Sequence, residues 1–181
     1  MAGTGGKKKV TGKEIQEQVA LLGDPVIEKR HGAVAALRKI GTPAVNPLIT
    51  AMAKARDNDG RWYAAIALSR IGEPAVASLI NAMKESTSRE FRRYAAAALG
   101  EIGSPAIDAL INGMESDDRE LRGFLSQALC RIGKPAVEPL TRRLGDQNEV
   151  IRQCAALTLW QMGETGLPAM VQSVQDEPDS R

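Results

Sequence analysis

A thirteen-residue motif recurs along the chain, and this repetition constrains the fold more than any other feature. The first copy begins at Ile40 and reads IGTPAVNPLITAM; the copies at Ile71 and Ile102 read IGEPAVASLINAM and IGSPAIDALINGM. A fourth copy, IGKPAVEPLTRRL, begins at Ile132, and a degenerate fifth, MGETGLPAMVQSV, begins at Met162. The copies are therefore 31, 31, 30 and 30 residues apart. A fixed period of this length is typical of solenoid arrays, in which each repeat is one supersecondary unit.

Each repeat has the apolar spacing of two helices. The apolar residues after the first proline fall at i, i+3, i+4 and i+7, on one face of a helix, and they are Val45, Leu48, Ile49 and Met52. The segment before each Ile-Gly pair carries an Ala-rich stripe that ends in leucine, and small side chains let neighbouring helices approach closely. One helix pair cannot bury both of its faces, whereas stacked pairs share a core. The pattern predicts an all-α fold, an α/α solenoid or superhelix of about five two-helix repeats.

Recurring glycines and polar residues mark the helix boundaries. Side-chain oxygens stand four residues before a recurring arginine, where they can cap the next helix, at Asp57, Ser88, Asp118 and Asn148. The second residue of each motif copy is a glycine, at the place where the preceding helix needs a left-handed C′ residue. These glycines are Gly41, Gly72, Gly103, Gly133 and Gly163. Capping-box spacing between Thr11 and Glu14 predicts an N-terminal capping helix from Lys13 to Leu22.

The ends of the chain differ from the array in composition. Lys7, Lys8, Lys9 and Lys13 supply four positive charges, although the 181-residue chain has a net charge of only +2. We predict a flexible basic arm over 1–12, the solenoid over 13–175 and a polar tail over 176–181. The near-neutral body argues against a dedicated nucleic-acid binder. Since no apolar run approaches the ~20 residues of a membrane span and the start lacks a signal-peptide core, we expect no membrane contact and a cytoplasmic location.

The conserved spacing within the repeat carries a family resemblance. The repeat resembles the HEAT-like repeats of the phycobilisome (PBS) lyase type. The resemblance lies in an arginine, two variable residues and Ala-Ala-x-Ala-Leu, followed by Ile-Gly and Pro-Ala-Val-x-Pro-Leu-Ile. The resemblance covers about residues 13–175 and implies an armadillo-like helical superhelix that recognises other macromolecules. It also implies that the arginine-containing helices lie on the concave side and the helices after each proline on the convex side.

One arginine recurs ten residues before the first residue of each motif copy. Residues that are identical in every repeat serve what every repeat needs, so we interpret this column as structural rather than as an anion-binding stripe. The resemblance to HEAT-type arrays implies that these arginines bond to loop carbonyls and acidic loop residues and tie one repeat to the next. This arginine ladder comprises Arg30, Arg61, Arg92, Arg122 and Arg152.

Variable positions on the groove face are the candidate binding surface. Four of the six aromatic residues stand one or two positions after a ladder arginine, edged mostly by basic groups. We predict a solvent-facing aromatic strip that binds a partner, with Trp62 as the best single candidate. The alternative is that Tyr63, Tyr94 and Phe124 fill space between neighbouring helices. The predicted binding residues are Trp62, Tyr63, Ile66, Arg70, Arg93, Tyr94, Glu101, Phe124, Gln127 and Arg131.

No catalytic, cofactor-binding or metal-ligating set is recognisable in the sequence. His31, Cys130 and Cys154 are too few for a Cys/His zinc site, and helix geometry keeps the two cysteines too far apart for a disulfide. His31 has no nucleophile or carboxylate set at a recognisable spacing. We therefore expect no cofactor, no metal and no enzymatic activity; if the chain is an enzyme, the resemblance implies one like a bilin lyase.

Three functions follow as hypotheses. The leading one is a non-catalytic protein–protein interaction scaffold that binds a protein or peptide partner in the concave groove. The second is a subunit resembling a phycobilin lyase or a phycobilisome-handling protein, in which basic groups would meet the propionates of a tetrapyrrole. The third is nucleic-acid binding through the basic groove, which would show a steep salt dependence. The sequence identifies neither the partner nor the oligomeric state.

Overall fold

The computed structural model describes residues 11–175, so most of the predicted arm and all of the predicted tail lie outside the described residues. Within 11–175 all regular structure is helical, which confirms the all-α prediction. The α-helices are α1 (Gly12–Ala20), α2 (Ile27–Ile40), α3 (Val45–Lys54), α4 (Asn58–Ile71), α5 (Val76–Glu85), α6 (Arg89–Ile102), α7 (Ile107–Gly113), α8 (Arg119–Ile132), α9 (Val137–Arg142), α10 (Glu149–Gln161) and α11 (Leu167–Gln175). Short 3-10 turns connect many of them, at Leu21–Gly23, Thr42–Ala44, Glu73–Ala75, Ser104–Ala106, Lys134–Ala136, Arg143–Gly145 and Gly163–Thr165.

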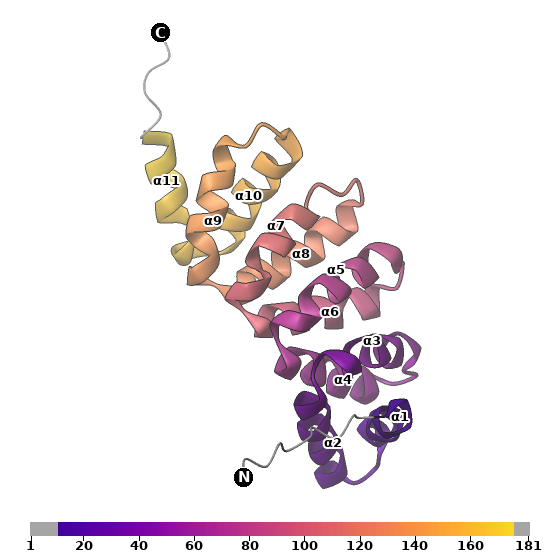
Figure 1. Ribbon diagram of the computed structural model, residues 1–181. Helices are drawn as coiled ribbons and strands as arrows, with labels where there is room; N and C mark the ends of the chain where they lie inside the picture. Colours follow the sequence, from indigo (N-terminus) through magenta and orange to yellow (C-terminus); the bar gives the residue numbers. More distant parts are fainter. Residues whose placement is uncertain (1–10, 176–181) are drawn as a thin grey trace, which may run out of the picture.

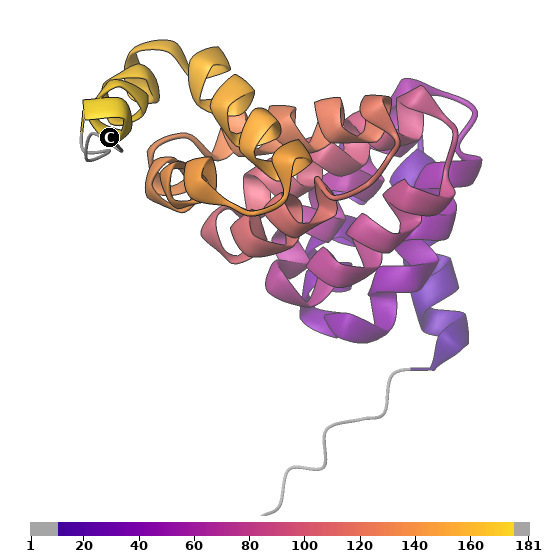
Figure 2. The same ribbon diagram turned by 90° about the horizontal axis from the view of Figure 1, so that it is seen from above.

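The helices stack in two rows to form the predicted solenoid (Figure 1). The even row, α2 to α10, carries the ladder arginines, and the odd row runs from α1 to α11. Consecutive even helices contact each other more extensively than consecutive odd helices do, as their Ala-rich stripes allow. The even row therefore lies on the inner side of the curve. Seen from above, the stack turns as it rises, so that α10 and α11 extend beyond the first repeats (Figure 2).

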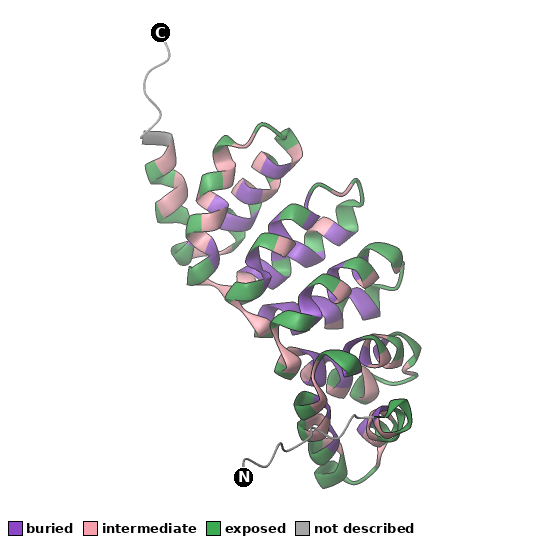
Figure 3. Ribbon diagram, viewed as in Figure 1, coloured by how far each residue is buried: buried purple, intermediate pink, exposed green. Residues whose placement is uncertain are grey.

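One continuous apolar core lies between the two rows. Leu37, Leu68 and Leu99 from the even row and Leu48 and Leu79 from the odd row are completely buried. Burial is most complete in the middle of the stack, where each repeat is covered on both sides, and it is least complete at α11 (Figure 3). This distribution is what a one-dimensional array requires, because each repeat contacts only its neighbours.

The predicted N-caps are confirmed. Side-chain oxygens of Asp57, Ser88, Asp118 and Asn148 each accept a backbone N–H in the first turn of α4, α6, α8 and α10. At the start of the described chain, Thr11 Oγ1 accepts from the backbone N–H of Glu14 at 3.2 Å, and the Glu14 carboxylate accepts from the backbone N–H of Thr11 at 2.8 Å. This capping box starts α1 at Gly12, one residue earlier than predicted, and α1 ends at Ala20.

All five recurring glycines have positive φ as predicted, but the first four, Gly41, Gly72, Gly103 and Gly133, are not left-handed helical. Gly41 has φ 73° and ψ −138°, and Gly103 has φ 82° and ψ −141°. This part of backbone space is open essentially to glycine. It turns the chain directly into the 3-10 turn that holds the proline, where Ala106 N–H donates to Gly103 O at 2.9 Å. The glycine therefore sets the angle between the two helices of a repeat.

A buried pair of hydroxyls joins α8 to α10. Ser126 Oγ lies 2.8 Å from Thr158 Oγ1, and Thr158 Oγ1 donates to Cys154 O at 2.7 Å. Both side chains are buried, and both replace small apolar residues of other repeats. The position of Ser126 is occupied by Ala65 and Ala96 in the two preceding repeats, and that of Thr158 by Ala36, Ala67, Ala98 and Ala128. The last two repeats are therefore joined by a polar contact, whereas the other junctions have apolar side chains at these two positions.

Candidate partner-binding surface

Arg92 is the most deeply buried ladder arginine, with 3% of its surface exposed. Its Nε donates to Met83 O of α5 at 3.0 Å, and its Nη2 and Nη1 lie 2.6 Å and 3.4 Å from the carboxylates of Asp118 and Glu120 in α8 and its cap. Arg92 thus joins α6 to the preceding repeat through α5 and to the following repeat through α8. Two hydrogen-bond donors, the backbone N–H of Leu121 and then the Arg92 guanidinium, lower the pKa of Asp118.

The other ladder arginines make fewer bonds. Arg30 Nη1 reaches Asp59 of the next repeat at 3.1 Å, although its buried Nε–H has no hydrogen-bond partner among the described residues. The remaining three bond to carbonyls within their own repeat: Arg61 to Asp57 O at 3.1 Å, Arg122 to Ser116 O at 2.6 Å, and Arg152 to Asp146 O at 2.7 Å. Within the described part of the chain, two of the five ladder positions, Arg30 and Arg92, thus reach a carboxylate in the following repeat.

The two positions after each ladder arginine face different surroundings. The first is exposed in every repeat, and it holds His31, Trp62, Arg93, Gly123 and Gln153. The second lies about 100° further round the helix and turns towards the preceding repeat. Tyr63 at this second position packs 4.8 Å from the Arg30 guanidinium and 5.9 Å from the His31 ring, measured to its ring centroid.

The prediction of a solvent-facing aromatic strip is therefore wrong for Phe124, which is only 8% exposed. Tyr63 and Tyr94 are half-buried, so filling of space between helices accounts for part of their surface too. Trp62 stands at the exposed first position, with 45% of its surface accessible. The prediction placed the first and second positions after each ladder arginine on one surface, whereas the turn of the helix directs their side chains differently.

A hollow of about 540 Å³ lies between α2 and α4, and we call it the α2–α4 hollow. Three predicted residues, Tyr63, Ile66 and Arg70, contribute to it from α4. The α2 side had no residues in the predicted set, and a search for i, i+3, i+4 and i+7 neighbours around His31 would have found most of them. The full lining is His31, Val34, Ala35, Arg38, Lys39, Tyr63, Ile66 and Arg70.

The cations around the α2–α4 hollow have no acidic partners among residues 11–175. Arg38, Lys39 and Arg70 are exposed, and none forms an ion pair with any carboxylate in the described part of the chain. At the corresponding places two repeats later, Glu101 replaces the first cation of the column and accepts from Arg131 Nε at 2.9 Å. The same column is thus neutralised at α6 and α8 and left positively charged at α2 and α4.

A second hollow, of about 360 Å³, lies between α6 and α8. Arg93, Phe124 and Gln127 from the predicted set line it, together with Arg89 and Glu90. Arg93 also covers the ring of Tyr94, with its guanidinium carbon 5.0 Å from the ring centroid. Trp62 lines neither of these two hollows. Six of the ten predicted binding residues therefore line two separate hollows, and the set does not form a continuous strip. The four that line neither hollow are Trp62, Tyr94, Glu101 and Arg131.

Comparison with protein families agrees with this architecture. A family profile described as HEAT repeats matches residues 15–80, 76–135 and 107–181. The chain belongs to the HEAT repeat family. The family resemblance seen in the sequence is thereby confirmed, and the overlapping matches follow the repeat period along nearly the whole chain.

Several solved structures are similar to this HEAT repeat chain at low identity. The complex of CpcE and CpcF of phycocyanin lyase from Nostoc sp. PCC7120 is 19% identical, with 93% of this chain and 92% of that chain covered and a TM-score of 0.41. An engineered protein is 20% identical (90% and 85% covered, TM-score 0.35), and a designed armadillo repeat protein is 18% identical (92% and 94% covered, TM-score 0.33). A comparison with curated proteins found no significant match. With TM-scores below 0.5, these likenesses carry no argument here, and the family assignment depends on the repeat profile.

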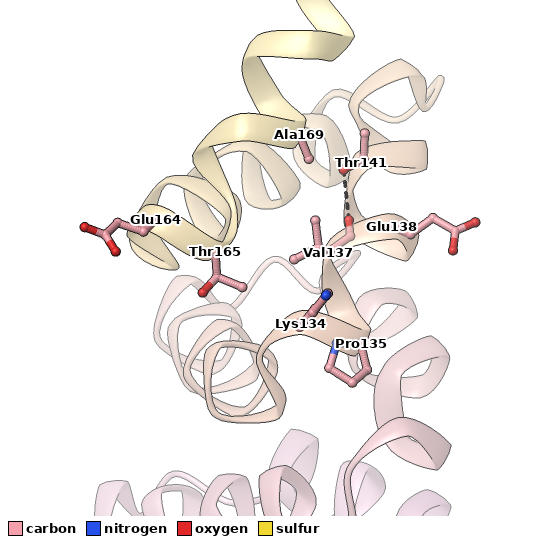
Figure 4. Close-up of a pocket in the computed structure, with 8 residues that line it drawn as sticks. All are labelled: Lys134, Pro135, Val137, Glu138, Thr141, Glu164, Thr165 and Ala169. Atoms are coloured by element: carbon pink, nitrogen blue, oxygen red, sulfur yellow. Dashed lines mark hydrogen bonds between the residues drawn. The ribbon is translucent and has the colours of Figure 1, made fainter.

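The last HEAT repeat adds a hollow on the opposite side of the array, between α9 and α11 (Figure 4). It has a volume of about 880 Å³, and Val137, Thr141, Thr165 and Ala169 face it, whereas the carboxylates of Glu138 and Glu164 point away. In the last repeat Thr165 and Gly166 replace the Pro-Ala pair of the other repeats. No aromatic side chain lines this hollow, and Lys134 is its single cationic lining residue, whereas Arg38, Lys39 and Arg70 line the α2–α4 hollow.

Neither cysteine has the surroundings of a reactive group. Cys130 and Cys154 are both free, and burial raises the pKa of each thiol, with Arg122 partly opposing this at Cys154. Within residues 11–175 there is no cluster of three or more His, Cys, Asp or Glu side chains that could hold a metal ion. No helix in the same range is both long enough and apolar enough to cross a membrane.

Proposed function

We propose that the protein is a non-catalytic interaction scaffold that binds an acidic segment of a partner protein on its even row, with the α2–α4 hollow as the main anchor. The observation that carries this proposal is a set of three cations around an apolar hollow, Arg38, Lys39 and Arg70, which form no ion pair with any described residue. HEAT repeats are extended interaction surfaces, and the inner side of such an array is a common place for partners to bind.

The two parts of the hollow have complementary roles. Val34, Ala35 and Ile66 offer apolar surface to an aliphatic or aromatic side chain, and Tyr63 adds a rigid amphipathic ring, a type of side chain enriched in binding hot spots. The cations above this surface attract carboxylates, guide their approach and disfavour basic partners. A volume of about 540 Å³ is adequate for one or two side chains of a peptide. Trp62, exposed on the same helix, would extend the contact beyond the hollow.

The test is quantitative capture of partners from a native extract with the wild-type chain and two matched charge variants. Arg70→Glu reverses an unpaired cation of the hollow, whereas Arg131→Gln removes the cation at the same position two repeats later, where it is paired with Glu101. We expect Arg70→Glu to weaken binding of the captured protein at least about tenfold in a titration and Arg131→Gln to change it less than about threefold. Trp62→Ala should weaken it as well without lowering the melting temperature.

Equal effects of the Arg70 and Arg131 variants would contradict the assignment of the anchor. Two other results would contradict the proposed class of partner. One is a changed absorption spectrum when the purified protein is mixed with a bilin. The other is tight binding of a nucleic acid whose affinity falls steeply and linearly on a logarithmic salt scale.

A further inference from the structure

The two hollows of the even row occupy equivalent places two repeats apart. Each is lined by the first position after the ladder arginine of its earlier helix, which is His31 in α2 and Arg93 in α6. Each is also lined, from its later helix, by the second position after the ladder arginine and by the residue three positions further on. These pairs are Tyr63 and Ile66 in the α2–α4 hollow and Phe124 and Gln127 in the hollow between α6 and α8, which we call the α6–α8 hollow. Both hollows therefore open on the same face of the array.

The two hollows differ in charge. The α2–α4 hollow is lined by three cations and by no carboxylate. The α6–α8 hollow is lined by both a carboxylate, Glu90, and a cation, Arg93, and its other cation, Arg89, is paired with Glu120 at 2.8 Å. Neither Glu90 nor Arg93 forms an ion pair within residues 11–175, so Glu90 would repel an acidic ligand and Arg93 a basic one. An uncharged group is the better match for this hollow.

An aromatic side chain with a polar tip suits the α6–α8 hollow. Phe124 supplies an aromatic part of the lining, against which a second ring can pack, and the volume of about 360 Å³ is adequate for one ring. The side chains of Glu90, Arg93 and Gln127 form no hydrogen bond with any described residue, so their acceptors and donors are available to a ligand. A tyrosine meets both conditions, because its hydroxyl donates to a carboxylate and accepts from an amide or a guanidinium.

The distance between the two hollows determines how far apart two anchoring residues must be. Helices α2, α4, α6 and α8 pack in succession (Figure 1), and packed helices lie about 8–10 Å apart. Two such steps and a shift of a few residues along the helix axes separate the hollows by about 20 Å. An extended chain advances about 3.1–3.3 Å per residue, so it covers this distance in about six residues. Residues six apart point to the same side in a β-strand and in a polyproline II helix, so both side chains can enter the hollows at once.

Trp62 lies between the two hollows. It occupies on α4 the position that His31 occupies on α2 and Arg93 on α6, and 45% of its surface is exposed. A segment that runs from one hollow to the other passes over this indole. The face thus offers apolar contact along the whole path and not only at its two ends.

We propose that the partner segment has two anchors, an acidic group in the α2–α4 hollow and, about six residues away, a tyrosine in the α6–α8 hollow. This inference rests on the proposed function, because the acidic anchor is the one proposed there. It adds a second binding site, the chemistry of the residue that fills it and the spacing between the two. Once the first anchor is bound, the second binds as an intramolecular step, so the affinity of the whole segment exceeds that of either anchor alone.

The experiment measures the binding of synthetic peptides to the full 181-residue chain by isothermal titration calorimetry. Every peptide contains the acidic anchor Glu-Leu-Glu. Separate peptides carry a tyrosine three, six or twelve residues away on both sides, across Gly-Ser spacers, so that either chain direction is sampled, and one peptide has no tyrosine. Three residues span at most about 11 Å, so the shortest spacing should bind no better than the peptide without tyrosine. The six-residue spacing should bind at least about tenfold more tightly, and the twelve-residue spacing should give a smaller gain.

Variants of the α6–α8 hollow show whether the gain arises there. Gln127→Ala and, independently, Arg93→Ala should remove most of the gain at the six-residue spacing and change binding of the peptide without tyrosine less than about threefold. Both side chains are exposed, so the melting temperature should stay near that of the wild type. Gln153→Ala is the matched control, because it removes an exposed glutamine of the even row that lines neither hollow, and it should change no affinity. Arg70→Glu should weaken binding of every peptide.

The second anchor and the proposed function fail in different ways. Affinities that depend on Arg70 but are equal for all spacings would overturn the second anchor and leave the proposed function in place. A gain from tyrosine that survives both Gln127→Ala and Arg93→Ala would do the same. If no peptide binds, or if binding is insensitive to Arg70→Glu, the proposed function and this inference are both wrong.

Discussion

Arg92→Ala should destabilise the fold by about 2–3 kcal/mol. The substitution removes a buried guanidinium together with its bonds to Met83 O, Asp118 and Glu120. Hydrogen bonds to charged groups contribute about 1.5–3 kcal/mol, and the loss also leaves a carbonyl without its donor. The two carboxylates are about 40% exposed and regain water when the arginine is removed, which keeps the cost below that of a fully buried ion pair.

The measurement is urea unfolding followed by far-ultraviolet circular dichroism, with Arg61→Ala as the control. Arg61 occupies the same ladder position one repeat earlier but makes a single bond to Asp57 O at 3.1 Å, so its removal should cost no more than about 1 kcal/mol. The melting temperature should also fall, by roughly 4–12 °C for Arg92→Ala. Equal costs for the two variants would refute the argument that the bonds to the next repeat make Arg92 special.

Three other predictions concern single positions. Gly100→Ala should destabilise by about 1–3 kcal/mol in the same assay, because the new methyl group would meet the Arg131 side chain at 2.6 Å, whereas Gly123→Ala, with open space around it, should stabilise by up to about 1 kcal/mol. Cys130 should react with iodoacetamide more slowly in the folded chain than in urea, because burial raises its pKa; equal rates measured by mass spectrometry would contradict this. The lowered pKa of Asp118 contributes stability that is fully present above about pH 4 and is lost as the pH falls through the folded-state pKa, and the Arg92→Ala variant should lose less stability over this range. A carboxyl titration by NMR that shows the same pKa for Asp118 in both proteins would contradict the last expectation.

The sequence predicted the architecture well because each boundary has a local chemical cause. Caps such as Asp57 and Asp118 act within their own first turn, and the positive φ of Gly103 depends on its missing side chain rather than on distant contacts. The ψ value of that glycine was not predictable, because the following 3-10 turn determines it. The order of the helices could therefore be predicted from the periodicity and the caps, whereas the geometry of their connections depends on the 3-10 turns.

The binding surface was harder to predict, because exposure depends on the helix that stacks beside each residue. Phe124 and Trp62 stand one position apart in the repeat, yet one is buried and the other exposed. The caps that follow the ladder arginines differ in charge, and this difference could have predicted which arginines bond to the next repeat. Arg92 is followed by an acidic cap, Asp118, whereas the cap after Arg61 is the neutral Ser88.

Repeats as alike as these can also stack in a wrong order, with one unit taking the place of another, and such misassembly is a known hazard of repeat proteins. The hydroxyls of Ser126 and Thr158 bear on that hazard, because they match only when α10 lies against α8. If α10 packed on α6, Thr158 would face Ala96, and if a copy of α6 packed on α8, Ser126 would face Ala98. In the first mismatch Thr158 keeps its bond to Cys154 O, whereas in the second Ser126 is buried without a partner, at a cost of about 1–3 kcal/mol. The hydroxyl pair thus favours the native order of the last two units over its alternatives, and replacing both residues by alanine should leave the native array stable while increasing the yield of misassembled chains on refolding.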